Sequence, residues 1–339
     1  MLMGKRTWTF ESKPVITSTG VIGGPFEKKG AIPDDFDAFY DDLWFGENSY
    51  EKAQKVMFEY ACETTLEKAG LKTEDVQFIF AGDLLNQITS TSFACRKLNI
   101  PFFGLFSACA TSMEGLALSA FILNANGANC ILTGSASHYA AVEKTFRYPN
   151  DYGSQKPPTS QRTTTAAGTA ILCKTGTGPV VTSATIGKVV DLGLKDPFNM
   201  GGAMAAAAVD TIEDHMEDRG ISPDYYDLIV TGDLASIGRA VALELFDRKG
   251  IQIKESKFQD CGLMLYKDDQ NVMAGASGSG CSAAVTYGHL INRINSGELN
   301  KILVVATGAL LSPTTFQQKE TIPCIAHAVS IESGGGASR

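Results

Sequence analysis

The sequence repeats itself, because four segments of its first half recur in the same order in its second half. PVITSTGVIG from Pro14 is matched by PVVTSATIGK from Pro179, and FIFAGDL, ending at Leu84, by LIVTGDL, ending at Leu234. GLFSACATSMEG is matched more loosely by AGASGSGCSAAV, and CILTGSAS by ILVVATGA. A repeat of roughly 150 residues is too long for a solenoid and indicates a duplicated domain. We therefore expect two similar halves with a pocket where they meet.

Each half alternates short apolar runs with helical patterns. VQFIF and LIVTG are typical of buried parallel strands, and residues 49–70 predict a helix that ends at Gly70. This alternation predicts an α/β protein whose sheets are mostly parallel and covered by helices. We place the first half at residues 1–176, the second at 177–332 and a flexible tail at 333–339.

Composition excludes several classes of function. The 339 residues carry a net charge of −8, which argues against binding nucleic acid. No apolar run is long enough to span a membrane, and the N-terminus has no signal-peptide pattern. The eight cysteines form no C-x-x-C pair, so we expect reduced thiols, no metal site and no cofactor.

Cys109 stands where the strand-like run FFGLF gives way to the helix-like TSMEGLALSAFIL. A thiol at the start of a helix faces unpaired N–H groups and the positive end of the helix dipole, which favours the thiolate. The small residues around it suit a sharp turn between strand and helix. The alternative interpretation is a buried cysteine that acts only as a small apolar side chain.

With the duplication, this turn resembles the nucleophile turn of the thiolase superfamily, particularly the ketoacyl synthases. The resemblance implies a five-layer αβαβα fold, a homodimer, and a cysteine deep in a pocket between the halves. In active members, two residues of the second half (His with Asn, or two His) move protons and hold the thioester oxyanion.

The second half lacks both of these partners. Gly232 and Asp233 stand where a histidine is expected, and Gly280 occupies the position of the oxyanion ligand. Of the four histidines, His138 follows a strand end and is the candidate for a substitute base, although it could instead be a polar pocket residue or a dimer contact. We therefore assign no catalytic residue, and we interpret Cys109 as standing at an ancestral nucleophile position.

A pocket without its base remains a cavity lined by helix starts, which suit a small carboxylate. Asp83 and Asp233 end equivalent strands, where α/β proteins bind ligands, although each of them could instead cap a local turn. Arg147 and Arg162 are the nearest counter-charges in sequence. The predicted ligand-binding residues are Cys109, Asp83, Asp233, Ser107, Thr111, Ser279, Gly280, Ser282 and His138.

The start MGKRTWTF, the segment FYDDLWFGE, SACATSMEGL and TGDLASIGR together resemble the stage V sporulation protein AD family of endospore-forming bacteria. The resemblance implies a non-catalytic protein that binds dipicolinic acid or its calcium chelate. It also implies work with membrane subunits of the same operon, in dipicolinate uptake during sporulation and release at germination. The expected location is the forespore or spore inner membrane, with peripheral attachment.

Three hypotheses follow. The first is a dipicolinate-binding protein, and the second is an acyl-thioester condensing enzyme that uses Cys109 with His138 as an unusual base. The third is a scaffold that docks partners through FDAFYDDLWF, residues 36–45. Saturable binding, a covalent acyl adduct and partner capture with a blocked pocket would distinguish them.

Overall fold

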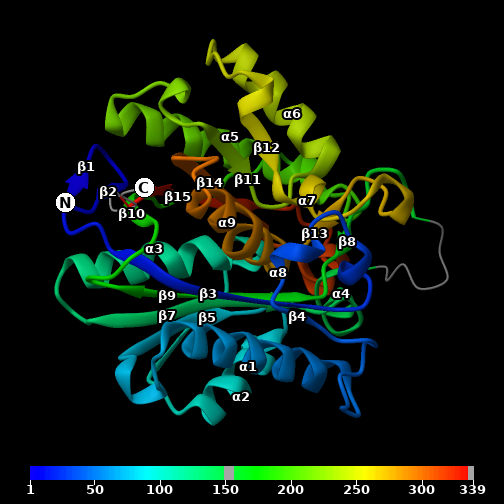
Figure 1. Cartoon of the computed structure of the whole chain (residues 1–339). Helices are drawn as coiled ribbons and strands as arrows, with labels where there is room; N and C mark the ends of the chain where they lie inside the picture. The colour runs from blue at the N-terminus through cyan, green and yellow to red at the C-terminus, as the bar shows by residue number, and fades with distance from the viewer. Residues whose placement is uncertain (149–155, 335–339) are drawn as a thin grey trace.

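The computed structural model describes residues 1–148 and 156–334, and most of the predicted tail lies outside this part of the chain. Three layers of helices alternate with two layers of strands (Figure 1). α5 and α6 cover one outer face, α1 and α2 cover the other, and α3, α8 and α9 fill the middle. The expected five-layer αβαβα fold is thus confirmed.

The two halves use their strands in the same order. The first half runs β3-β9-β7-β5-β6 and the second runs β10-β15-β14-β11-β12, each from the centre of the molecule outward. Their bounds are β3 Val15–Gly23, β5 Phe78–Gly82, β6 Phe102–Gly104, β7 Cys130–Ser137, β9 Ala166–Cys173, β10 Val180–Thr185, β11 Leu228–Thr231, β12 Phe258–Asp260, β14 Lys301–Ala309 and β15 Cys324–Glu332.

The two halves share one continuous sheet, because β10 pairs with both β15 and β3. The link between β10 and β3 is the antiparallel pair Val180 and Val15. The predicted boundary at residues 176 and 177 lies between β9 and β10.

The expectation of mostly parallel sheets is only half right. β5 runs parallel to β6 and β7, and β11 runs parallel to β12 and β14. β9 and β15, however, run antiparallel to both of their main neighbours. A strand that runs antiparallel to its neighbour needs no crossover helix. The helical layers therefore belong to the connections between parallel strands and not to the connections into β9 and β15.

The outer helices begin and end as their sequences indicate. α1 (Tyr50–Ala69) starts at Ser49, whose hydroxyl accepts from the amide of Lys52, and ends at Gly70 with a φ of 64°. Only glycine adopts this left-handed backbone without strain. The predicted helix 49–70 is confirmed. The other outer helices are α2 Thr89–Leu98, α5 Met200–Arg219 and α6 Ala235–Arg248.

The two central helices are repeats of each other but differ in form. α3 (Thr111–Asn124) is regular, whereas its counterpart consists of α8 (Ser279–Ala284), a π-helical stretch (Val285–Leu290) and α9 (Ile291–Asn295). They meet where the Ser112 hydroxyl lies 2.8 Å from that of Ser282. The repeats align these two serines with each other, so this contact marks the pseudo-twofold axis.

The N-terminal strap, residues 1–9, packs on the second half. Within it, β1 (Leu2–Met3) pairs with β2 (Thr7–Thr9), and β2 pairs with β10. Arg6 binds Asp210 and Asp214 of α5. The start of the chain therefore stabilises the second half.

The segment at residues 23–47 and the long connection after β7 contain short elements. β4 (Ala38–Phe39) pairs with β3, and Trp44 stays half exposed while it stacks on Tyr50. The connection between β7 and β9 includes α4 (Tyr139–Phe146) and β8 (Arg162–Thr163), and its residues 149–155 lie outside the described part of the chain. Smaller elements of the second half are α7 Cys261–Met264, β13 Ala276–Ser277 and α10 Pro313–Gln317.

One pair of cysteines departs from the expectation of reduced thiols. Cys130 and Cys173 are cross-strand partners of β7 and β9, and their sulfurs form a disulfide. The other six cysteines are free and buried. Strand register, which a scan for cysteine spacing cannot see, brings this pair together.

Candidate functional site

Cys109 lies on a tight turn between β6 and α3. Ala108 precedes it with a φ of 49°, in the left-handed region that non-glycine residues seldom adopt. The turn is fixed by the Ala110 amide, which donates to the Ser107 carbonyl, and by the Thr111 hydroxyl, which donates to the Ala108 carbonyl. This strained turn holds the sulfur at the start of α3, as the sequence predicted.

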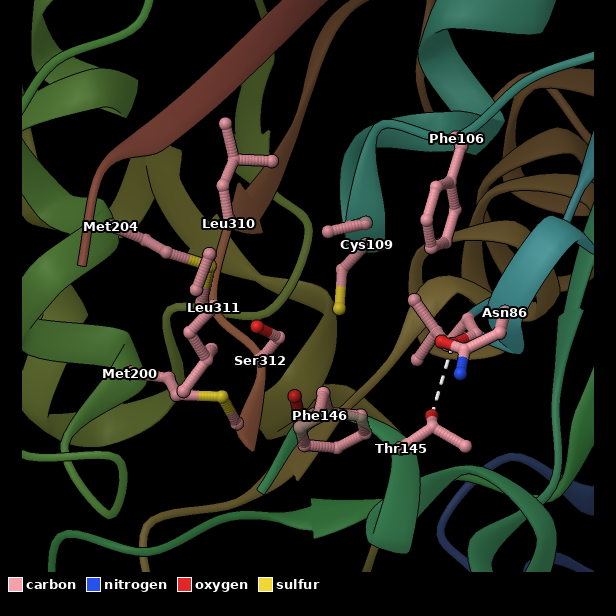
Figure 2. Close-up of a pocket in the computed structure, with 14 residues that line it drawn as sticks. Asn86, Phe106, Cys109, Thr145, Phe146, Met200, Met204, Leu310, Leu311 and Ser312 are labelled. Atoms are coloured by element: carbon pink, nitrogen blue, oxygen red, sulfur yellow. Dashed lines mark hydrogen bonds between the residues drawn. The ribbon is translucent and has the colours of Figure 1, made fainter. Parts of the chain in front are cut away.

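The sulfur points into a cavity of about 330 Å³ between the two halves (Figure 2). In Figure 2, Leu311 and Ser312 face it from one side and Phe106 and Asn86 from the other. The described lining residues are Leu84, Asn86, Phe106, Ala108, Cys109, Thr145, Phe146, Met200, Met204, Ser277, Ala309, Leu310, Leu311 and Ser312. This lining is mostly apolar and carries no charged side chain.

The thiol faces the carboxyl group of Asp233 rather than an imidazole. Burial raises the pKa of the Cys109 thiol well above its usual range, and the Asp233 carboxyl raises this pKa further. The Gly278 amide and the Ser277 hydroxyl oppose the shift only in part. The expectation that the helix start would favour a thiolate is therefore wrong for this site, because burial and the carboxylate outweigh the helix.

Asp233 is buried and braces the second elbow, residues 277–282. Its carboxylate accepts hydrogen bonds from the Ser277 hydroxyl at 2.9 Å, the Gly278 amide at 3.0 Å and the Thr307 hydroxyl at 2.8 Å. Burial raises the pKa of Asp233, and these donors together with Cys109 lower it. Asp233 thus lies beside Cys109, but its oxygens serve the protein's own backbone and hydroxyls.

Asp83, the equivalent residue of the first half, does not line the cavity. It accepts from the amides of Leu85 and Thr91 and from the Thr91 hydroxyl, at 2.6 to 2.8 Å. These contacts tie the end of β5 to the start of α2. The cap interpretation of Asp83 is correct, and its assignment as a ligand-binding residue is not supported.

The second elbow is hydrogen-bonded to residues of the first half. The Ser279 hydroxyl donates to the Ala136 carbonyl, and the Gly280 amide donates to the Ser137 hydroxyl. A Cβ atom at Gly280 would lie 2.3 Å from the Ala166 carbonyl oxygen, so no side chain fits there. The Ser282 hydroxyl contacts Ser112 and the Cys109 carbonyl. These three predicted residues form a wall behind the cavity, not its lining.

The remaining predicted residues lie around the first elbow or farther away. Thr111 and Ser107 hold the turn, because the Ser107 amide donates to the Thr111 hydroxyl. Neither residue lines the cavity. His138 does not reach it either, because Nε2 contacts the Leu43 carbonyl and the ring stacks on Tyr50. Burial lowers the pKa of His138 to about 4. The structure therefore places His138 outside the described lining of the cavity.

His327 on β15 is the imidazole that approaches the elbow. Its Nε2 lies 3.4 Å from the Ser107 hydroxyl, and its Nδ1 accepts from the Gly187 amide. Burial lowers its pKa to about 4, so the ring is neutral. No hydrogen bond joins an imidazole to the Cys109 sulfur among the described residues.

The two arginines expected as counter-charges do not reach the cavity. Arg147 is buried and binds Glu143, which also accepts from the Thr163 hydroxyl. Arg162 stacks between Phe26 and Tyr139 in a separate pocket. Neither arginine is therefore a counter-charge for the described lining of the Cys109 cavity.

Sequence reasoning missed most of the true lining. Met200, Met204 and Phe146 come from helices, and Leu310–Ser312 follow the end of β14. For Leu310–Ser312, the only signal was the duplication, because these residues follow ILVVATGA, the repeat of the strand CILTGSAS. Apolar lining residues carry no motif of their own.

Within residues 1–148 and 156–334, no three His, Cys, Asp or Glu side chains gather to hold a metal ion. In the same part of the chain, no helix combines the length and the apolar character needed to cross a bilayer.

Known structures share the fold of this chain. The chain superposes on 3-oxoacyl-[acyl-carrier-protein] synthase III from Aquifex aeolicus VF5 with a TM-score of 0.56 and 14% identity, covering 94% of this chain and 99% of the other. Human mitochondrial 3-ketoacyl-CoA thiolase in complex with CoA gives a TM-score of 0.60 at 11% identity, covering 96% and 100%. At this identity the likeness establishes the thiolase-like fold alone.

Sequence comparison is more specific. The family described as Stage V sporulation protein AD (SpoVAD) matches residues 4–332. Stage V sporulation protein AD of Bacillus subtilis (strain 168) is 45% identical over 337 residues, which cover 99% of both chains. The chain therefore belongs to the stage V sporulation protein AD family.

Proposed function

We propose that the protein serves sporulation by binding dipicolinate in the Cys109 cavity, without turning it over. The relationship to Bacillus subtilis stage V sporulation protein AD supports the role in sporulation. The observation that carries the proposal is a cavity at Cys109, whose thiol faces the Asp233 carboxyl group instead of an imidazole.

The shape and chemistry of the cavity support a flat aromatic acid. Phe106, Phe146 and Met204 offer apolar surfaces to a ring, and Asn86 and Ser312 offer polar groups to its edges. A volume of about 330 Å³ lies at the small end of the range for ligand sites.

The absence of charged side chains from the described part of the lining favours the calcium chelate over the free dianion. Burying two carboxylates beside Asp233 without a counter-charge would be costly. Calcium bound to dipicolinate makes a neutral complex, whose open coordination positions accept hard oxygen ligands. The side chains of Asn86, Thr145 and Ser312 supply such oxygens at the cavity surface.

A buried, protonated thiol supports binding rather than acyl transfer. Thioester chemistry needs a thiolate and a base close to it. Here the thiol pKa is raised, and Asp233, the carboxylate that faces the thiol, is engaged by three hydrogen-bond donors. Incubation with acetyl-CoA should therefore leave the intact mass unchanged, and an acyl adduct at Cys109 would instead establish the condensing enzyme.

Isothermal titration with dipicolinate, with and without calcium, tests the proposal. We expect saturable binding that is tighter with calcium. Phe106→Ala should weaken it about tenfold, the cost of one aromatic contact, because the 60% exposed Phe106 forms one wall. The matched control is Phe93→Ala, since Phe93 is 48% exposed and lies outside the cavity. No saturation under either condition, or equal affinity in both variants, would overturn the proposal.

Attachment to membrane subunits of the same operon, a peripheral position at the spore membrane and a homodimer remain predictions. The exposed Trp44 within residues 36–45 keeps this segment available as a docking surface.

A further inference from the structure

A groove on the first half, which we call the disulfide groove, is lined by both residues of the Cys130–Cys173 bridge. It has a volume of about 530 Å³, and Cys130 is partly exposed there whereas Cys173 is buried. A reagent in solution therefore reaches the bridge from the side of Cys130. The described lining residues are Thr17, Ala69, Leu71, Asn129, Cys130, Cys173, Lys174 and Thr175, and they include one basic side chain and no acidic one.

The six free cysteines offer no comparable sulfur. All six are buried, and burial raises the pKa of each of these thiols above its usual range. A buried, protonated thiol is a poor nucleophile toward a disulfide. A thiol that opens the Cys130–Cys173 bridge must therefore come from outside the chain.

A β-bulge places a hydroxyl beside the buried sulfur of the bridge. The pairing of β3 with β9 shifts register between Ile16 and Ser18, so Thr17 is the extra residue, and bulges redirect a side chain in this way. The Thr17 hydroxyl donates to the Cys173 sulfur at 3.9 Å and to the Ile171 carbonyl at 3.3 Å. A disulfide sulfur is a weak acceptor, but a thiolate at Cys173 would compete strongly for this hydroxyl.

The second half shows what the same bulge does with a charged acceptor. Thr182 aligns with Thr17 in the repeat, and it is likewise the extra residue of a bulge, in β10. Its hydroxyl donates to the Glu332 carboxylate at 3.0 Å. Glu332 holds the place of Cys173, since each pairs with the valine two residues before its bulge threonine. The bulge threonine thus serves an anion in the second half, and the same geometry suits a thiolate in the first.

We propose that the Cys130–Cys173 bridge is a reversible thiol-exchange site, which a small thiol reaches through the disulfide groove. The incoming thiolate forms a bond to the Cys130 sulfur, and the bond between the two cysteines breaks. Its electron pair leaves on the Cys173 sulfur, where the Thr17 hydroxyl stabilises the thiolate. A second small thiol then bonds to the sulfur of the first, which frees Cys130 and leaves the two small thiols joined as their disulfide. The two small thiols thus supply the two electrons and two protons that reduce the bridge.

The fold allows the bridge to open and close without unfolding. β7 and β9 are paired along their whole lengths, with Cys130 opposite Cys173 at the end of the ladder. Just beyond the bridge, the Lys174 amide donates to the Asn129 carbonyl at 3.0 Å. These backbone hydrogen bonds keep the two cysteines opposite each other after reduction, so oxidation re-forms the same pair.

Incubation of the folded full chain with an excess of reduced glutathione at pH 8 tests the proposal. After an acid quench, the chain is unfolded, its free thiols are labelled with N-ethylmaleimide, and its peptides are analysed by mass spectrometry. We expect glutathione on Cys130 and maleimide on Cys173, with maleimide alone on the buried Cys62 and Cys281. Glutathione disulfide should then restore the bridge. An intact bridge after several hours, or glutathione on Cys173 instead of Cys130, would overturn the proposal.

Thr17→Val and Thr182→Val form a matched pair, because they remove equivalent hydroxyls from the two bulges. Thr17→Val should slow the exchange about threefold, since the leaving sulfur loses its donor, and Thr182→Val should leave the rate unchanged. A local loosening of the strands would speed the exchange, so a slower rate separates the role of the hydroxyl from a loss of packing. Equal rates in the two variants, or a faster rate in Thr17→Val, would contradict the proposal. If circular dichroism shows that Thr17→Val is unfolded, the position of glutathione on the wild-type chain decides.

Discussion

The two elbows are copies of one turn but have different structural roles. In the first, Ala108 takes the strained backbone and Cys109 opens onto a cavity. In the second, Gly278 takes the equivalent position, and Ser279, the counterpart of Cys109, is bonded to Ala136. The first elbow thus opens onto a cavity, whereas the second is packed against the first half.

The paired aspartates diverged in the same way. Asp83 connects β5 to the start of α2. In the second half, that task passed to Asp260 of β12, which accepts from the amides of Leu234 and Ala235 at the start of α6. Asp233 was thereby left to hold the second elbow opposite Cys109. The start of the outer helix is thus held by a different aspartate in each half, Asp83 in the first and Asp260 in the second.

The largest expected effect tests whether the second elbow is only packing. Gly280→Asn, which introduces an amide like that of an active family member, should destabilise the protein by about 3 kcal/mol or more because of overpacking against Ala166. The aligned change in the first elbow, Ala110→Gly, should cost about 1 kcal/mol. Urea unfolding monitored by circular dichroism measures both. Equal losses would contradict the difference between the elbows.

An intermediate effect sharpens the comparison of the aspartates. Asp233→Asn and Asp83→Asn should each cost about 1–3 kcal/mol, since each leaves buried donors poorly satisfied. Only Asp233→Asn should speed alkylation of Cys109 by iodoacetamide at pH 8, because it removes the charge that raises the thiol pKa. The rate should rise about tenfold for each unit by which this pKa falls.

Peptide mass spectrometry at Cys109 follows this reaction. An unchanged rate in Asp233→Asn would show that burial alone protonates the thiol. Acceleration in Asp83→Asn would mean that the two aspartates are not distinct in role.

A pH-dependent effect compares one buried imidazole from each half. The pKa values of His138 and His327 are lowered to about 4, below the unfolded value. Between pH 6.5 and 4 the unfolded chain binds more protons, so each ring should cost the fold about 1.4 kcal/mol per pH unit as the pH falls. His138→Gln and His327→Gln should each remove this contribution, and the double variant should remove both. Urea unfolding at pH 6.5, 5.5 and 4.5 measures the slopes. Slopes equal to that of the wild type would contradict buried, neutral rings.

The fold was predictable because its signals are local or repeated. The helix at 49–70 carries its own start and end residues, and the duplication predicted both the two halves and the position of the Cys109 turn. The antiparallel course of β9 and β15 and the Cys130–Cys173 pair were not predictable, since they depend on which strands lie side by side.

The site was predictable only at Cys109 and, beside it, Asp233. Placing a residue at the end of a strand fixes its backbone but not the direction of its side chain, so Asp83, Ser279 and His138 point to protein partners instead of the cavity. Phe106 and Met204, which form the walls, carry no chemical signature in the sequence. Chemical motifs identify reacting groups better than they identify binding surfaces.

The shared sheet has a consequence for how a molecule could enter and leave the cavity. Because β10 is hydrogen-bonded to strands of both halves, the halves cannot swing apart like a hinge without breaking backbone hydrogen bonds at the centre. Exchange must instead depend on local breathing of the rim, where Phe106, Leu310 and Leu311 are at least partly exposed. For the proposed ligand, a few side chains at the entrance, and not the body of the protein, would then govern the rate of release.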